Sequence, residues 1–273
     1  MSEETGEKSF WAHLDDLRGV LFRGIALYVA ACVALFAFLP SLFDTVILAP
    51  TRGDFPTYRL FERIAGIAPA LAEASFSEPE SAATNIQLVN IELASQFFIH
   101  VSATCWMALV MTLPALIYIL WTFVRPGLYP SERRYSRTAF IAGNAMFYLG
   151  ASVGYFLVFP LTLRFLAGYQ LSPLIPNVVS LTSYMDTFVT LLLLMGLIFE
   201  LPLLAWILGK TGLITREFFT RYRRHAIVVL VVLAAMITPT GDPLTLAVVF
   251  IPIYILWELS AWLVKPRSKV TEV

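Results

Sequence analysis

The sequence carries little charge. Lys, Arg, Asp and Glu together make up 14% of its 273 residues, whereas soluble globular domains contain about 25%. The 19 basic and 19 acidic side chains also cancel, so no net positive field exists to attract the phosphates of nucleic acid. These two deficits exclude an ordinary cytosolic enzyme, and they predict no nucleic-acid partner.

Cysteines are also scarce. The chain has two, Cys32 and Cys105, and both lie inside apolar runs, where a thiol usually behaves as a small hydrophobic group. We therefore expect no structural disulfide. The sequence lacks the P-loop, HExxH and GxSxG motifs and any GxGxxG after a predicted strand. Without these motifs we predict no nucleotide hydrolysis, and we expect no cofactor and no bound metal.

Apolar residues, by contrast, are abundant: 58% of the chain is hydrophobic and the mean hydropathy is +0.75. A helix needs about 20 apolar residues to cross a bilayer. Four runs of that length, interrupted by charge only at Glu200, predict spans at 24–43, 97–124, 138–163 and 187–208. Two shorter runs flank a turn rich in Pro and Gly and predict a short fifth and a short sixth span at 226–237 and 244–257.

The basic residues predict the orientation. Of the 19 Lys and Arg residues, 15 fall on the side of the two termini, and cationic segments remain in the cytoplasm. The acidic start of the chain is unlike a cleavable signal peptide. We therefore predict an all-α integral membrane protein with one six-span domain over residues 1–273 and with both termini cytoplasmic.

Two segments outside the spans have patterns of their own. Residues 10–22 carry apolar side chains at helical spacing, which predicts an amphipathic helix lying on the cytoplasmic surface before the chain turns into the membrane. Residues 41–96 form a long external loop, in which further helical spacing predicts a cap.

Two carboxylates are expected at the same cytoplasmic boundary. Asp16 lies in the predicted surface helix, and Glu132 follows the helix-capping Ser131 at the start of the third span. Such a pair suits a dication or two guanidinium groups. The structural alternative is an Asp15–Arg18 pair on the first helix and a Glu132 stabilised by the helix dipole.

Glu200 is the sharpest single signal, because an ionised carboxylate inside a span is costly unless it is protonated, paired or facing water. Pro202, two residues later, lacks an N–H and should bend the span. A bonded, protonated Glu200 is the alternative, with Asn144 as its expected partner. These features also fit a proton-coupled small-solute transporter, which we keep as an alternative function.

Three other features have ordinary structural interpretations. Gly150 and Gly154 form a small-xxx-small face that predicts close helix packing. Glu258 is expected to reach the inner interface by snorkelling. The basic run 221–225 should set the topology, with anionic lipid binding as a second possibility.

Four segments, in this order, resemble motifs of the TatC subunit family of the twin-arginine protein translocase. Residues 10–18 resemble F-x-x-H-L-x-E-L-R, and residues 123–134 resemble F-x-x-P-(G/A)-L-x-x-x-E-R-(R/K). Residues 199–202 match F-E-x-P, and residues 238–243 approximate T-P-x-D-P. The chain departs from the family at Asp16, where Glu is usual, so this carboxylate reaches one methylene less.

The resemblance implies a receptor that is not an enzyme. It would bind signal peptides with consecutive arginines, assemble with TatA-type and TatB-type single-span proteins, and export folded proteins with the proton motive force. The implied fold is six helices in a concave, glove-like arrangement in a bacterial inner membrane. Glu200 and Pro202 would lie in the intramembrane cavity where partners bind. The implied signal-peptide site comprises Asp16, Glu132, Phe123, Leu128, Arg134, His13, Leu14 and Arg18. Besides the transporter, a purely structural scaffold remains as a third hypothesis.

Overall fold

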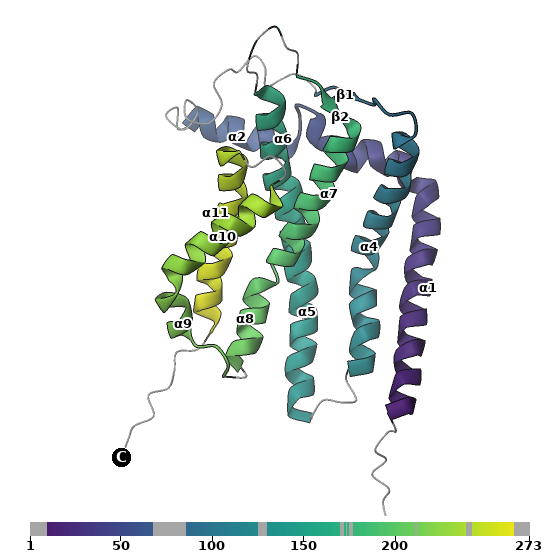
Figure 1. The fold of residues 1–273 in the computed structure, drawn as a ribbon, viewed down its shortest axis with the longest axis vertical. Coiled ribbons are helices and arrows are strands. Elements are labelled where there is room, and N and C mark those ends of the chain that lie inside the picture. Colours follow the sequence, from purple (N-terminus) through teal and green to yellow (C-terminus); the bar gives the residue numbers. More distant parts are fainter. Residues whose placement is uncertain are drawn as a thin grey trace, which may run out of the picture. The chain divides into compact units, whose positions relative to one another are not determined.

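The structure is a computed structural model that describes residues 10–67, 86–124, 130–169, 172, 174, 177–210, 212–238 and 242–264. The side chains of residues 10–14, 16, 61, 62, 64–67, 124, 130–136 and 244 lie outside this description. Most of the described chain is helical (Figure 1). In chain order the elements are α1 (Phe10–Leu42), the π-helical turn η1 (Phe43–Ile47), the 3-10 turn η2 (Ala49–Thr51), α2 (Pro56–Ile67), β1 (Leu88–Val89), α4 (Ser95–Val124), α5 (Pro130–Val153), the π-helical turn η4 (Gly154–Val158), α6 (Phe159–Gly168), β2 (Val179–Ser180), α7 (Leu181–Ile198), α8 (Leu201–Lys210), α9 (Arg216–Arg221), α10 (Arg223–Ile237) and α11 (Pro243–Leu263).

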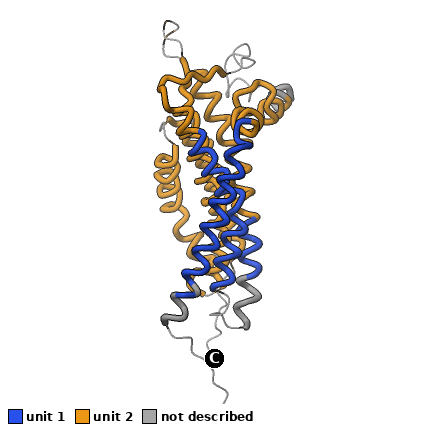
Figure 2. The backbone as a smooth tube through the Cα atoms, turned by 90° about the vertical axis from the view of Figure 1, so that its right-hand side faces the viewer, with its two compact units in different colours: residues 1–40, 100–144 blue, residues 41–99, 145–273 orange. Residues whose placement is uncertain are grey.

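The chain divides into two compact units, drawn in different colours in Figure 2. The first comprises residues 1–40 and 100–144, and the second comprises residues 41–99 and 145–273. The divisions fall inside α1, α4 and α5. Each unit is therefore built from segments that lie far apart in the sequence.

Five stretches of the described chain are long and apolar enough to cross a membrane. They are Leu17–Leu60, Ser95–Phe123, Arg137–Gly168, Leu181–Lys210 and Thr245–Leu263. Helix α10 has 15 residues and a length of about 22 Å, which is less than the ~30 Å hydrocarbon core. The four long spans and the short fifth span thus confirm the sequence prediction.

The sixth span is longer than its apolar run predicts. The run ends before Glu258, but α11 continues to Leu263 and has 21 residues. Glu258 is compatible with this helix because its carboxylate pairs with the guanidinium of Arg223 on α10. Of the two spans predicted to be short, only the fifth remains so.

The prediction of a separate surface helix over residues 10–22 is wrong. These residues are the first turns of α1, which runs without interruption from Phe10 to Leu42. The first proline in the helix is Pro40, and the earlier glycines, Gly19 and Gly24, keep their backbone N–H groups. Helical hydrogen bonding therefore propagates from the amphipathic segment straight into the span.

Helices α1 and α4 pack antiparallel in the first unit. A Cβ on Gly24 would meet the side chain of Leu116 at 3.5 Å. Toward the other end, the ring of His100 stacks on Phe36 with centroids 4.2 Å apart. Between these contacts the hydroxyl of Tyr28 donates to the carbonyl of Cys105 (3.1 Å). The N-terminal end of α1 thus lies beside the C-terminal end of α4.

In the second unit, the end of α5 and the following turn η4 approach α7 closely because three glycines line the contact. A Cβ on Gly150 would lie 2.5 Å from the carbonyl oxygen of Met195, and one on Gly154 would lie 3.2 Å from Leu192. From the facing helix, a Cβ on Gly196 would meet the Phe147 ring at 2.7 Å. The close packing predicted for Gly150 and Gly154 is therefore confirmed.

Prolines shape the segment that follows α1. Pro50 has no N–H to offer the carbonyl of Val46 one turn earlier, and the hydroxyl of Tyr155 donates to that carbonyl instead (2.8 Å). Pro160 likewise leaves the carbonyl of Phe156 without its helical donor, and the hydroxyl of Thr57 bonds to it. Both replacement donors come from a distant part of the chain.

A side chain also replaces a missing backbone donor in the first unit. Pro40 interrupts the hydrogen bonding of α1 one turn after Phe36. Nε2 of His100 lies 3.0 Å from the Phe36 carbonyl oxygen. Because a carbonyl only accepts, Nε2 must carry the proton in this contact.

The outer segment, here residues 43–67 and 86–99, docks on η4 and α6. Tyr58 on α2 is buried; its hydroxyl reaches the carbonyls of Pro50 (2.9 Å) and Pro160 (3.2 Å), and the guanidinium of Arg164 lies 4.3 Å from its ring centroid. Strands β1 and β2 pair in parallel, with Leu88 opposite Val179 and Val89 opposite Ser180. The sequence did not predict this two-residue pairing, since such short strands carry no periodic signal.

The glycine contact predicts that Gly150→Ala destabilises the second unit. Its methyl group would collide with backbone at Met195, and overpacking of this kind costs about 1–3 kcal/mol. Chemical unfolding of the detergent-solubilised protein, followed by tryptophan fluorescence, measures the loss. Gly168→Ala is the matched control, because no atom lies within 4 Å of a Cβ there. Equal unfolding free energies for the two variants would contradict this account.

The proline contacts predict that Tyr155→Phe weakens the docking of the outer segment. Removing the hydroxyl leaves the Val46 carbonyl unsatisfied, which costs about 1–3 kcal/mol. The same unfolding measurement detects the change. Tyr169→Phe serves as the control, since Tyr169 is exposed and its hydroxyl bonds to no described residue. A Tyr155→Phe variant as stable as this control would show that the hydroxyl contributes nothing.

Candidate functional site

Three helix ends meet at one end of the first unit. Asp16 lies eight residues before Gly24 on α1, and Val124 lies eight residues after Leu116 on α4. Because α1 and α4 are antiparallel and both rise about 1.5 Å per residue, Asp16 is level with the end of α4. The rings of Tyr118 on α4 and Phe140 on α5 are 6.1 Å apart, so α5 begins at this same end.

Glu132 occupies the first turn of α5. Its backbone lies at the same end of the first unit as the backbone of Asp16. The side chains of both residues lie outside the described part of the structure. The backbone therefore brings the two predicted acidic positions to one end of one unit, while the geometry of their carboxylates stays a prediction.

Of the other predicted residues of this site, the structure describes the side chains of Phe123 and Arg18. Phe123 is half-buried at the end of α4. Arg18 is exposed on α1, and its guanidinium lies 5.6 Å from the ring centroid of Phe22. Leu128 lies outside the described residues, as do the side chains of His13, Leu14 and Arg134.

Glu200 lies at a break in the fourth span. Helix α7 ends at Ile198 and α8 begins at Leu201. The amide of Glu200 donates to the carbonyl of Leu197, three residues back (3.1 Å), and not to the carbonyl four residues back as in an α-helix. The cause is Pro202, which is buried and has no N–H for the Ile198 carbonyl. The sequence predicted a bend at Pro202, and the structure has an interruption there, which is visible between α7 and α8 in Figure 1.

The Glu200 side chain is half-buried, and its carboxyl accepts no hydrogen bond from the described residues of its own unit. Its expected partner, Asn144, belongs to the first unit, where Nδ2 donates to the carbonyl of Phe140 on its own helix (2.9 Å). The pairing of Glu200 with Asn144 thus stays a prediction. A carboxyl without a local partner can bind a neighbouring helix or water.

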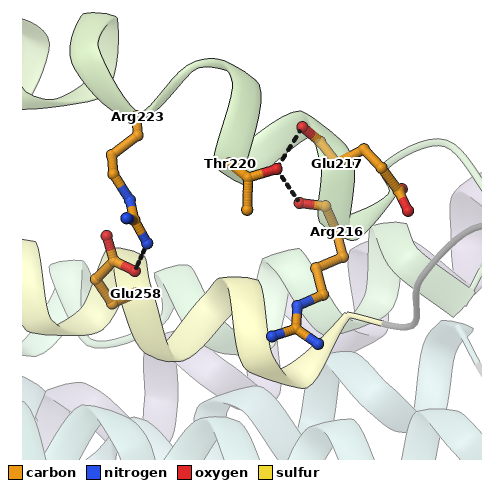
Figure 3. A network of polar contacts seen from close by, with 5 residues as sticks. All are labelled: Arg216, Glu217, Thr220, Arg223 and Glu258. Atoms are coloured by element: carbon orange, nitrogen blue, oxygen red, sulfur yellow. Dashed lines mark hydrogen bonds and ion pairs between the residues drawn. The ribbon is translucent and has the colours of Figure 1, made fainter.

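Sequence reasoning missed one ion pair. Nη2 of Arg223 donates to Oε2 of Glu258 (2.6 Å), joining the start of α10 to the last turns of α11 (Figure 3). The signal was available in the register of the hairpin: Arg223 precedes Thr240 by 17 residues and Glu258 follows Gly241 by 17. Snorkelling alone therefore does not explain Glu258.

Within the described ranges no three His, Cys, Asp or Glu side chains gather in a way that could hold a metal ion. The described chain instead offers two carboxylate positions at one end of the first unit, a carboxyl at the break between α7 and α8, and a basic segment between α8 and α10.

Comparison with known proteins identifies the family. Residues 12–252 match the sequence profile of the family "Sec-independent protein translocase protein (TatC)". The Sec-independent protein translocase protein TatC of Blattabacterium sp. subsp. Periplaneta americana (strain BPLAN) is 31% identical over 264 residues, which cover 96% of this chain and 97% of that relative. Its counterpart from Deinococcus radiodurans is 30% identical over 256 residues, or 94% and 85% of the two chains.

Solved structures agree with this result. A crystal structure of the twin arginine translocase receptor TatC has a TM-score of 0.66 and covers 92% of this chain and 97% of its own. A second, of the same receptor in DDM, has a TM-score of 0.68 and covers 93% and 99%. Both are 26% identical in sequence. With its long membrane spans and the short α10, this chain belongs to the TatC family of Sec-independent protein translocase components, multi-pass proteins of the inner membrane.

Proposed function

We propose that this protein is the receptor subunit of a twin-arginine translocase. It binds signal peptides that carry two consecutive arginines and organises TatA-type and TatB-type single-span partners for the export of folded proteins, driven by the proton motive force. The observation that carries the proposal is the meeting of the α1, α4 and α5 ends in the first unit, with Asp16 and Glu132 on two of them.

The chemistry of this end suits an arginine pair. Two carboxylates can each accept a bidentate, charge-assisted hydrogen bond from a planar guanidinium. The backbone brings Asp16 level with the last residues of α4, and Glu132 follows after a connection of five residues, 125–129. Five residues span at most about 20 Å, so both carboxylates stay within reach of one extended peptide.

Residues around the acids supply the rest of the proposed site. Phe123 offers an apolar surface at the end of α4, which suits the apolar residues of a signal peptide. Arg18 lies over the ring of Phe22 on the surface of α1. His13, Leu14, Leu128 and Arg134 complete the set by resemblance to the family motifs.

The proposal predicts that recognition depends on both carboxylates. A fluorescent signal peptide with Arg-Arg should bind the detergent-solubilised protein more tightly than the same peptide with Lys-Lys, because lysine lacks the planar fork. Asp16→Asn and Glu132→Gln should each weaken Arg-Arg binding by about tenfold or more, as expected for the loss of a charge-assisted bond. Fluorescence anisotropy gives the dissociation constants.

Glu92→Gln is the matched control for charge, because Glu92 is exposed and lies in the second unit before α4. It should leave binding unchanged. If Asp16→Asn and Glu132→Gln bind the Arg-Arg peptide as tightly as this control does, the assignment of the site is wrong.

Glu200 is proposed to act after recognition, where the membrane helices contact partner helices or water. It lies at the break between α7 and α8, where Pro202 leaves backbone polar groups without helical partners. A carboxyl at such a position has its greatest effect on helix association and local hydration. The site of peptide recognition belongs to the other unit, so the two roles can be separated.

Glu200→Gln should therefore keep signal-peptide binding but reduce export of a folded reporter protein in cells that depend on this receptor. The loss expected from removing one functional carboxyl is about tenfold or more. Leu204→Gln, an equally polar change at an exposed position one turn away, is the control. Undiminished export in Glu200→Gln would refute the role, and solute uptake by the reconstituted protein alone would favour a transporter instead.

A further inference from the structure

Helix α9 follows α8 and precedes α10 in the sequence, and it exposes aromatic side chains. Phe219 is 5% exposed and packs on Trp257, with ring centroids 4.8 Å apart. Its neighbours Ala205, Ala261 and Val264 complete a small buried cluster. Phe218 and Tyr222, by contrast, are each 41% exposed, with centroids 5.0 Å apart. Phe219 thus fixes α9 to α8 and α11, while the rings of Phe218 and Tyr222 stay outside this buried cluster.

The same segment is strongly basic. Residues 210–225 contain five Lys and Arg side chains and a single acid, Glu217. Arg223 is neutralised by Glu258 at 2.6 Å. Arg216, Arg221 and Arg224 are exposed, and none of them forms an ion pair within the described chain. The backbone around Arg216 is held by the hydroxyl of Thr220, which donates to the carbonyl of Glu217 (3.1 Å; Figure 3).

Position decides which anion suits this surface. The segment joins the ends of α8 and α10, two helices of the membrane domain, on the side that the positive-inside rule assigns to the cytoplasm. Exposed aromatic rings at a helix end are typical of the headgroup level of a bilayer. Guanidinium groups beside them match the phosphates of acidic lipids, which are concentrated in the cytoplasmic leaflet. A soluble acidic partner would not require the exposed rings.

We infer that the α9 surface, defined as Arg216, Phe218, Arg221, Tyr222 and Arg224, binds the phosphate headgroup of an anionic phospholipid. Arg221 and Arg224 supply the charge, and the guanidinium of Arg221 is held 6.0 Å from the ring centroid of Tyr222. Phe218 and Tyr222 contact the glycerol and upper acyl region. Arg224 is exposed in the first turn of α10, which the Arg223–Glu258 pair holds against α11.

Native mass spectrometry of the full-length protein in detergent tests the inference, with phosphatidylglycerol and phosphatidylcholine of identical acyl chains as probes. Each arginine near a membrane surface favours an anionic lipid by about fivefold. The wild type should therefore prefer phosphatidylglycerol by at least about tenfold. The double variant Arg221→Gln/Arg224→Gln should lose this preference, and added salt should weaken it in the wild type.

Arg59→Gln/Arg63→Gln is the matched control, because it removes two exposed positive charges from α2 instead. It should keep the preference for phosphatidylglycerol. Phe218→Ser/Tyr222→Ser should lower the affinity for both lipids without changing their ratio. Since all these side chains are exposed, unchanged thermal unfolding verifies that each variant is folded.

Three outcomes would overturn the inference. The first is a wild type without any preference, and the second is an equal loss in the α2 control, which would mean that net charge alone attracts the lipid. The third is displacement of phosphatidylglycerol by millimolar inorganic phosphate, which would assign the surface to a free anion rather than to a lipid.

Discussion

The structure depends on one constraint: a backbone carbonyl inside a membrane has no water to bond and must find a donor within the protein. Prolines create the difficulty, because each removes the N–H that the carbonyl one turn earlier would use. Near the ends of the first and third spans, His100, Tyr155 and Thr57 supply the missing donors from distant segments. Pro40, Pro50 and Pro160 thereby become points where another segment attaches.

Pro202 has a different consequence. Where the carbonyls freed by Pro40, Pro50 and Pro160 receive a side chain, the fourth span instead ends as α7 and begins again as α8. The interruption lies in the middle of the span and carries Glu200, a residue that a continuous apolar helix would not tolerate without a partner. A local backbone defect and an intramembrane carboxyl thus occur together, in a family whose members translocate proteins.

Most charged side chains lie near helix ends, and the two units carry different groups there. The first unit brings the acidic positions of Asp16 and Glu132 to one end. The second carries the basic segment between α8 and α10, where a single pair, Arg223 with Glu258, stabilises the hairpin. Paired carboxylates suit arginine-bearing peptides and exposed guanidinium groups suit acidic lipids, so a contact between a guanidinium group and an anion underlies both interactions.

The sequence by itself determined the number and order of the spans, the short α10, the break at Pro202 and the glycine face of α5, because each follows from composition or from one residue's covalent geometry. It also identified the family through four motifs. It did not predict the continuity of α1, the full length of α11, the pairing of β1 with β2 or the contact of Arg223 with Glu258. Only the tertiary structure decided these, because whether a charge, a freed carbonyl or a two-residue strand is stable depends on a partner far away in the chain.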